Sequence, residues 1–365
     1  MSQCRRTAFT RLNQTAARLV LVALMLAVLA SVVVSLSPLA NDRTSGPRDG
    51  AGDVALYRAE IERIRAGQSY YAAVSDELPQ RGYPSQSVFN WRTPLPMAML
   101  GGLPDPKLGQ ALLALLATAV LMWGFSTLAD EFGLLVACIG GLLLAGVLLL
   151  CVVGDLYVMP VLWSGVLMAL SLCGYARNEW RVAVAAGILA ALFRELALPY
   201  VLMIAALAFW RRQWRELAWW IVGLTVFACF YTVHITLVRE VIRPDAVSHE
   251  NGWVRFGGWA FVLSAAQIHG LLLVVPHWVT AIYLPLAVFG LVAWQTPAGQ
   301  RFALVGLAFL VGLSIVGQSF NQYWGALVAP LWCFGAAIAP LAIADLLRAA
   351  GWLRQSDPLP ATSAA

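Results

Sequence analysis

Ten apolar runs, most of them separated by short polar turns, are the feature of this sequence that most constrains its fold. They lie at residues 19–40, 109–128, 132–153, 156–175, 181–194, 196–210, 217–238, 277–295, 301–318 and 324–346. The chain is 60% hydrophobic and 12% charged, whereas soluble domains carry about 25% charged residues. Its mean hydropathy is +0.74. The sequence therefore predicts an all-α, polytopic transmembrane helix bundle of about ten spans.

Basic residues indicate how this bundle is oriented. Most of the turns expected on the inner side contain arginine, and cytoplasmic loops are enriched in basic residues. These arginines are Arg177, Arg181, Arg211, Arg212, Arg215, Arg301, Arg348 and Arg354. We expect both chain ends inside, with a cytoplasmic N-terminus at 1–18 and a cytoplasmic, disordered tail at 347–365. The transmembrane domain at 19–346 then includes an outer, periplasmic loop at 41–107.

The first apolar run is expected to be an uncleaved helix. It spans about twenty residues, which exceeds the 7–15 residues of a signal-peptide apolar region. Arginine supplies nearly all the positive charge, and the single lysine is Lys107. This usage is typical of a GC-rich bacterial genome, so we expect a bacterial inner, or plasma, membrane protein.

Two segments do not fit simple spans. The runs at 181–194 and 196–210 are too short to cross about 30 Å as straight, independent helices. Either they tilt, or they meet around the polar step Arg194–Glu195 within a cavity. The apolar segment 259–275 would break the even count if it spanned, so we interpret it as a helix that lies on the outer surface or dips into the membrane.

The outer loop 41–107 carries the first candidate for chemistry. Asp53 precedes the amphipathic segment 54–66, whose spacing fits a helix lying on the membrane face. Asp53 can be a general base for an acceptor hydroxyl at the membrane–water boundary. It can also be a helix N-cap, a position that aspartate favours, and one residue can serve both roles.

Arginines are the candidates for binding an anion. Arg194 and Glu195 interrupt an apolar stretch, and ionisable groups at membrane depth usually face a cavity or each other. Arg194 can hold a phosphate in bidentate geometry, or it can form a structural ion pair with a group such as Asp155. Arg92, in Trp91–Arg92–Thr93–Pro94, can also contact phosphate or be an interfacial anchor.

Other polar residues of the outer segments are candidates for sugar binding. His249 and Glu250 are adjacent and can bind sugar or metal, although one such pair is weak metal evidence. Gln322 and Tyr323, in the last outer turn, suit sugar hydroxyls and faces as well as an interfacial aromatic belt. No Walker loop, GxGxxG fingerprint or HExxH motif occurs. No cofactor is indicated, no metal ligands are assigned, and dependence on a divalent metal stays open.

Taken together, these motifs resemble the GT-C superfamily of integral-membrane glycosyltransferases. Within it, the chain looks like the bacterial polyprenyl-phosphate-sugar-dependent, mannosyltransferase-like branches. The resemblance covers about residues 15–345. It is carried by Gly52–Asp53–Val54–Ala55–Leu56–Tyr57, by a second interfacial helix at about 92–103, and by the Arg194–Glu195 step at an outer helix junction. Many members show paired acids in the loop, whereas Asp53 has only Asp49 close by.

The resemblance implies a function and its site residues. Asp53 would be the catalytic base, and Arg194 or Arg92 would lie near the phosphate of a polyprenyl-phosphate-linked sugar. Tyr57, Glu195, His249, Gln322 and Tyr323 are the further substrate-binding candidates. The expected activity is transfer of the sugar to a lipid, glycan or protein hydroxyl on the periplasmic side. The alternatives are a transporter or flippase of a lipid-linked glycan, and a non-catalytic membrane subunit of an envelope assembly complex.

Overall fold

The computed structural model describes residues 7–37, 52–248 and 254–353. Among these residues, six helices are long and apolar enough to cross a membrane. They are α1 (Gln14–Ser35), α6 (Lys107–Phe132), α7 (Leu134–Leu148) with its 3-10 extension η3 (Leu149–Cys151), α11 (Trp214–Val241), α14 (Pro297–Ile315) and α15 (Ala329–Ala349). Shorter apolar helices are α8 (Pro160–Ala176), α9 (Trp180–Phe193), α10 (Leu198–Trp210) and α13 (His277–Ala293). Each of the ten apolar runs thus coincides with a helix. Ten membrane crossings remain a prediction.

Large apolar side chains lie exposed along the outside of the bundle. On α1 they include Leu19, Met25, Leu29 and Val33, each more than 60% exposed. Exposed apolar surface this extensive marks a membrane or protein contact. Together with the six long apolar helices, it makes the chain an α-helical membrane protein.

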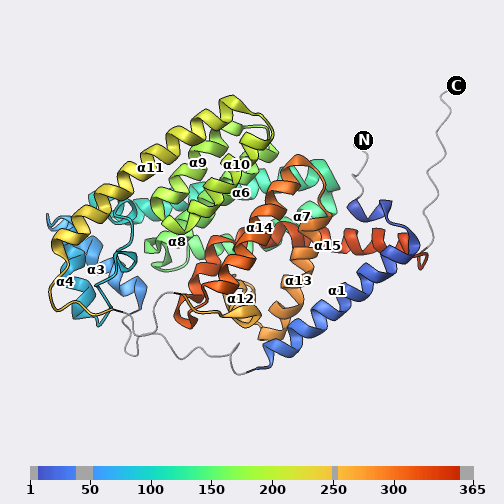
Figure 1. Ribbon diagram of the computed structural model, residues 1–365, viewed down its shortest axis with the longest axis horizontal. Coiled ribbons are helices and arrows are strands. Elements are labelled where there is room, and N and C mark those ends of the chain that lie inside the picture. Colours follow the sequence, from blue (N-terminus) through green and yellow to red (C-terminus); the bar gives the residue numbers. More distant parts are fainter. Residues whose placement is uncertain (1–6, 38–51, 249–253, 354–365) are drawn as a thin grey trace.

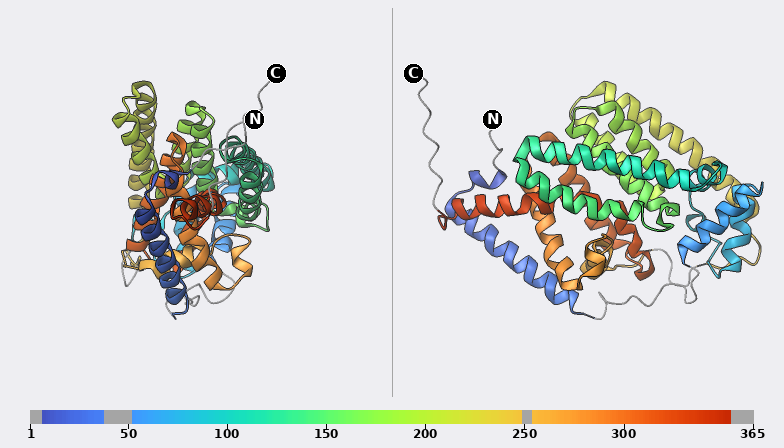
Figure 2. Two further views of the ribbon diagram at one scale, coloured as in Figure 1. Left: turned by 90° about the vertical axis from the view of Figure 1, so that its right-hand side faces the viewer. Right: turned by 180° about the vertical axis from the view of Figure 1, so that it is seen from behind.

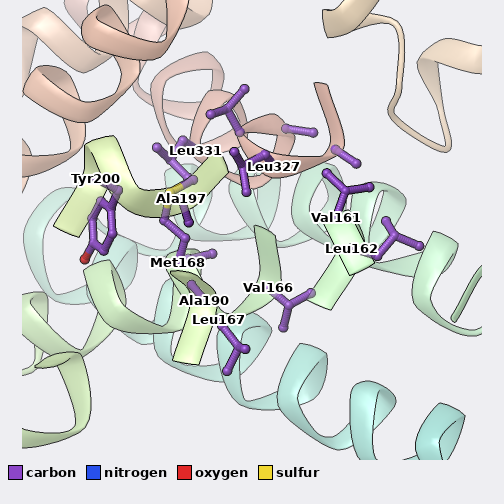
Figure 3. Close-up of a cluster of buried hydrophobic side chains, with 14 of the residues drawn as sticks. Val161, Leu162, Val166, Leu167, Met168, Ala190, Ala197, Tyr200, Leu327 and Leu331 are labelled. Carbon is purple, nitrogen blue, oxygen red and sulfur yellow. The ribbon is translucent and has the colours of Figure 1, made fainter. Parts of the chain in front are cut away.

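The centre of the bundle is helix α8. Every residue from Pro160 to Tyr175 is buried, so α8 is apolar all round, as a fully enclosed helix must be. Figure 3 shows its side chains meeting Ala190 of α9, Tyr200 of α10 and Leu331 of α15. This core fixes the junction between α9 and α10 against the beginning of α15.

Both ends of the transmembrane region come together at one end of the molecule. The Gln14 side chain at the start of α1 donates to the carbonyl of Ala350, just after α15, at 3.1 Å. Asp345 of α15 accepts from the backbone N–H and the hydroxyl of Thr7, both at 3.0 Å. Figure 1 shows the start of α1 and the end of α15 on the same side, far from α3 and α4. That both termini share one face of the membrane stays a prediction.

The loop between α1 and α6 folds into a layer of short helices. They are α3 (Asp53–Arg65), α4 (Tyr70–Gln80), the 3-10 turn η2 (Val88–Asn90) and α5 (Leu95–Gly102). Figure 2 shows this layer at the end of the bundle, beside the end of α11. The Ser75 hydroxyl of α4 donates to the carbonyl of Val241, the last residue of α11, at 3.3 Å. Helices predicted between the first two apolar runs are therefore present and pack onto the bundle; their place on the outer face of the membrane stays a prediction.

The segment 259–275 contains two short elements instead of one long helix. They are α12 (Gly258–Ala266) and η6 (Leu272–Val274). Besides η2, η3 and η6, the 3-10 turns of the described residues are η1 (Ala8–Arg11), η4 (Leu156–Val158), η5 (Glu195–Ala197) and η7 (Ser319–Leu327). At nine residues, α12 is too short to cross a membrane. Its buried face, which includes Phe261 and Leu263, packs against η7 and α14.

Glycines allow α13 and α15 to touch backbone to backbone. A Cβ on Gly290 would lie 1.9 Å from the carbonyl oxygen of Gly335, and one on Gly335 would lie 1.9 Å from that of Ala287. Small residues permit such close helix packing in membranes. We expect Gly290→Leu to force the helices apart and to lower the thermal unfolding midpoint by several degrees, because overpacking costs about 1–3 kcal/mol or more. Gly102, with open space around it, is the control; equal midpoints for Gly290→Leu and Gly102→Leu would contradict this packing.

Candidate active site

Ion pairs join α3 to α4 within this layer of short helices. Arg63 of α3 pairs with Glu77 of α4 at 2.5 Å and with Asp76 at 3.1 Å, and Arg81 pairs with Glu77 at 2.8 Å. The Ile64 side chain lies so close to Gly101 of α5 that a Cβ there would come within 2.5 Å. The buried face of α3, which contains Tyr57 and Glu60, is therefore fixed above the bundle.

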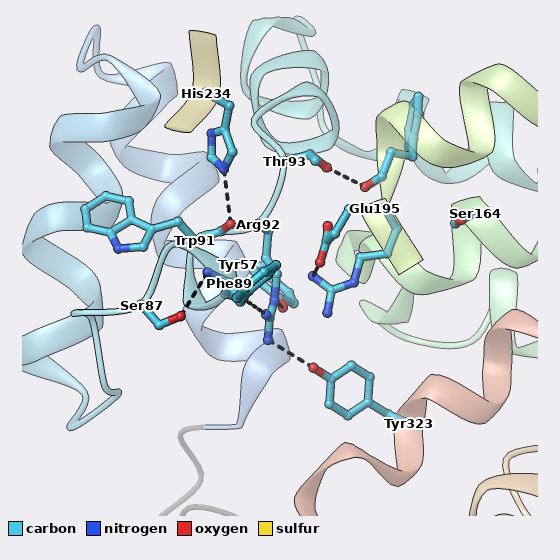
Figure 4. Close-up of polar contacts among 12 residues, drawn as sticks. Tyr57, Ser87, Phe89, Trp91, Arg92, Thr93, Ser164, Glu195, His234 and Tyr323 are labelled. Atoms are coloured by element: carbon cyan, nitrogen blue, oxygen red, sulfur yellow. Dashed lines mark hydrogen bonds and ion pairs between the residues drawn. The ribbon is translucent and has the colours of Figure 1, made fainter. Parts of the chain in front are cut away.

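Arg92 joins this layer to the last part of the chain. Its Nε donates to the Tyr57 hydroxyl of α3 at 3.0 Å, and its Nη2 donates to the Tyr323 hydroxyl of η7 at 3.0 Å. Its Nη1 donates to the carbonyl of Phe89 at 2.9 Å. Figure 4 shows Arg92 between Tyr57 and Tyr323. All three partners are neutral, so these hydrogen bonds do not neutralise the positive charge of the guanidinium.

Arg194 and Glu195 occupy the break between α9 and α10. Arg194 has extended backbone angles (φ −154°, ψ 117°) between the end of α9 and η5. The hydroxyl of Thr93 donates to the carbonyl of Phe193 at 2.8 Å, which ties this junction to the Arg92 segment. Of the two alternatives from sequence, the helices therefore meet around Arg194–Glu195.

The Arg194 side chain is buried but incompletely paired. It is only 2% exposed, and its Nη1 lies 3.3 Å from the Glu195 carboxylate. That ion pair lacks the alignment of a hydrogen bond, and both Arg194 Nη1 and Glu195 Oε2 are without a hydrogen-bond partner among the described residues. Buried polar groups in folded proteins are nearly always bonded, so unpaired atoms here favour a ligand site.

Arg92, Arg194 and Glu195 line one cavity of about 540 Å³. Its other walls are mostly apolar and come from α10, α11 and α14, including Leu198, Phe227, Tyr231, Phe309 and Leu313. The size falls within the usual range for ligand pockets. Two guanidinium groups beside an apolar slot suit an amphipathic anion, with its charged head at the arginines and its tail between the helices.

Asp53 lies beside this cavity and not in its wall. It is the first residue of α3, half-buried, and its carboxylate accepts from the Tyr83 hydroxyl at 2.8 Å. The N-cap is Gly52, so the N-cap interpretation of Asp53 is wrong by one position. A carboxylate in the first turn is still stabilised by the helix dipole.

The charge of Asp53 acts on Arg92. Burial is the largest single influence on the pKa of the Arg92 guanidinium and lowers it, but Tyr323, Tyr57, Asp53 and Glu195 together raise the pKa by more. The net pKa is well above the ordinary value, so Arg92 stays cationic. Burial has the opposite effect on Tyr57, whose pKa it raises. The Tyr57 hydroxyl therefore stays neutral and able to donate. The candidate base Asp53 and the candidate phosphate ligand Arg92 therefore interact electrostatically.

The remaining sequence candidates fare differently. Tyr57 and Tyr323 both contact Arg92. Gln322 is half-buried and makes no hydrogen bond to a described residue. His249, like Asp49 and Glu250, lies outside the described residues. Asp155 makes no capping bond and pairs with Arg58 at 2.8 Å, so the proposed ion pair between Arg194 and Asp155 is wrong.

Four further polar groups are buried here, and the sequence analysis gave two of them, Glu60 and Asn90, no role. Glu60 Oε2, Asn90 Nδ2, Asn321 Nδ2 and Trp324 Nε1 are buried without a hydrogen-bond partner among the described residues. Trp324 lines the same cavity as Arg194. Spacing could have identified Glu60, because it lies seven residues after Asp53 and therefore on the same face of α3.

Glu60 predicts a pH dependence of stability. Burial raises the pKa of its carboxyl to about 8, with Glu77 and Asp53 adding to the effect and Arg92 and Arg81 opposing it. Because the folded state holds the proton and the unfolded state releases it at lower pH, stability falls as pH rises towards 8. We expect the thermal midpoint to fall by several degrees between pH 6 and 8, and Glu60→Gln to flatten this profile. Glu62→Gln, exposed on the same helix, should not; an unchanged slope in Glu60→Gln would contradict the assignment.

Within residues 7–37, 52–248 and 254–353, no three His, Cys, Asp or Glu side chains are grouped as ligands for a metal ion. The carboxylates of the site each face a different partner: Asp53 faces Tyr83, and Glu195 faces Arg194.

This chain shows similarity to a known protein in its structure. No family model matches the chain, and no curated protein matches it. Among solved structures, the chain is similar to the crystal structure of ArnT from Cupriavidus metallidurans in the apo state, with 19% sequence identity and a TM-score of 0.46. The match covers 89% of this chain and 60% of that one, so the chain spans less than two thirds of its length.

Proposed function

We propose that this protein is a GT-C-type membrane glycosyltransferase that transfers a hexose from a polyprenyl-phosphate donor to an acceptor hydroxyl on the periplasmic side of a bacterial inner membrane. The observation that carries the proposal is the cavity in which Arg92 and Arg194 stand beside an apolar slot between α10, α11 and α14. A polyprenyl phosphate has the matching chemistry, because it joins an anionic head to a long apolar tail.

The donor phosphate would lie between the two guanidinium groups. In the donor the phosphate is a diester with one negative charge, and after transfer it is a monoester with up to two. Arg92, whose bonds go to the neutral Tyr57, Tyr323 and Phe89, can stabilise the charge that develops on leaving. Interactions that strengthen as the reaction proceeds accelerate it.

Asp53 would act on the acceptor. Its carboxylate takes the proton from the acceptor hydroxyl while the hydroxyl oxygen forms a bond to the anomeric carbon of the sugar. The bond from that carbon to the phosphate oxygen breaks, and polyprenyl phosphate leaves with the electron pair. Attack opposite the leaving group inverts the anomeric configuration. The hydrogen bond from Tyr83, at 2.8 Å, would orient the carboxylate.

An incubation with labelled polyprenyl-phosphate mannose, in vesicles that contain the full chain and crude envelope glycans as acceptor, tests the proposal. We expect release of polyprenyl phosphate together with label on a new glycoside. A transporter of a lipid-linked glycan would instead move intact donor across the vesicle. A non-catalytic subunit would do neither, and either of these results, repeated with donors of other hexoses, would overturn the proposal.

A further inference from the structure

A second cavity lies in the outer layer, apart from the membrane-spanning helices. It measures about 530 Å³ and is formed by the end of α4, the loop after it, and the segment that follows α11. Its walls include Tyr83, Ser85, Arg243, Asp245, Ala246 and Ser248. Because α11 ends at Val241, the cavity is lined by loop residues beyond the end of that helix.

The walls of this second cavity are held in place by backbone bonds. The N–H groups of Ser85 and Gln86 donate to the carbonyl of Val247 at 3.1 and 3.2 Å. On the other side, the Trp91 indole donates to the carbonyl of Ser85 at 2.9 Å. Gly82, with φ 71°, turns the chain out of α4 in a conformation that favours glycine. The cavity is therefore preformed.

Tyr83 connects this second cavity to the candidate base. Its side chain lines the cavity, and its hydroxyl donates to Asp53 at 2.8 Å. On its other side, Asp53 acts on Arg92, which lines the apolar cavity. Asp53 thus stands between an apolar cavity with two arginines and a polar cavity at the outer surface.

We propose that the second cavity binds the acceptor, and that the acceptor is a neutral glycan that arrives from the aqueous side. This inference rests on the proposed function, since it assigns the second substrate of the same site. The hydroxyls of Ser85 and Ser248 make no hydrogen bond to a described residue and are free for sugar hydroxyls. Arg243 and Asp245 are paired at 3.4 Å, so the charges of the lining balance, and an anionic acceptor would gain little.

The test measures sugar binding by saturation-transfer NMR to the full chain in lipid nanodiscs. The probes are mannotriose, galactotriose and maltotriose. We expect at least one to bind the wild-type protein, and Ala246→Trp or Ser248→Trp, which fill the cavity, to raise its Kd at least tenfold. The matched control is Ala72→Trp, at an exposed position of α4 outside the cavity, which should bind like wild type. Binding of polyprenyl phosphate, measured on the same samples, should be unchanged in all variants and shows that they are folded.

The outcomes separate this inference from the proposed function. If polyprenyl phosphate binds but none of the three sugars does, or if sugar binding survives in both cavity-filling variants, the acceptor assignment is overturned while the donor site stands. If a sugar binds and both variants lose it, the acceptor assignment is supported. If polyprenyl phosphate fails to bind wild-type protein, the proposed function is overturned, and with it the acceptor assignment.

Discussion

Replacing Asp53 by Asn is expected to lower the rate of sugar transfer by about 10²–10⁴-fold, the contribution of a positioned general base. The asparagine amide cannot take the proton from the acceptor hydroxyl. Its oxygen can still accept the Tyr83 hydrogen bond, which measures 2.8 Å in the wild type, so folding and membrane insertion should be preserved. The measurement is the single-turnover rate with saturating labelled donor.

A second carboxylate of the same layer supplies the control. Asp76 of α4 pairs at 3.1 Å with Arg63, which lies near the opposite end of α3 from Asp53, so Asp76→Asn removes one ion pair without touching Asp53. We expect that variant to transfer sugar at nearly the wild-type rate. Full activity in Asp53→Asn would remove Asp53 from the mechanism.

Replacing Arg194 by Gln is expected to have the second largest effect, a loss of about 10²–10³-fold in transfer rate, as for removal of a donor that stabilises developing charge. Donor binding should weaken as well, because Arg194 would hold the phosphate in the ground state too. Arg194→Lys keeps the charge but loses the planar fork and should show an intermediate rate. Both the transfer rate and the Kd for polyprenyl phosphate are to be measured.

Loss of folding has to be separated from loss of function in this variant, because Arg194 is buried and Glu195 would lose its cation. Thermal unfolding of Arg194→Gln and Arg194→Lys provides that comparison. Arg58→Gln removes an exposed arginine that pairs with Asp155, and it should change stability by less than about 1 kcal/mol. A stable Arg194→Gln protein with wild-type donor binding would exclude Arg194 from the phosphate site.

The sequence was sufficient for the helices because each apolar run is a local signal. It also indicated the junction at Arg194, since two short runs that flank an Arg–Glu step have few arrangements in a membrane. It could not show that Arg92 bonds to Tyr323, because 231 residues separate them and only the packing of α8, α9 and α15 brings their segments together. No pattern distinguishes such a contact from an interfacial belt.

The errors in the site have physical reasons too. The sequence allowed Asp53 to be the N-cap of its helix, but Gly52 occupies that position with extended backbone angles. The Asp53 carboxylate accepts a hydrogen bond from Tyr83 instead. Asp155 was a possible partner of Arg194, but its carboxylate forms an ion pair with Arg58, an exposed residue of α3. Glu60 was overlooked because a glutamate among charged residues of an amphipathic helix is usually solvated, whereas this one is 2% exposed.

The most direct test of the account is an electron cryomicroscopy structure of the full chain with a polyprenyl-phosphate sugar bound. The account predicts density for the phosphate within hydrogen-bonding distance of both Arg92 and Arg194, with the prenyl tail between α10, α11 and α14 and the sugar directed towards Asp53. A donor bound elsewhere, with this cavity empty, would contradict it.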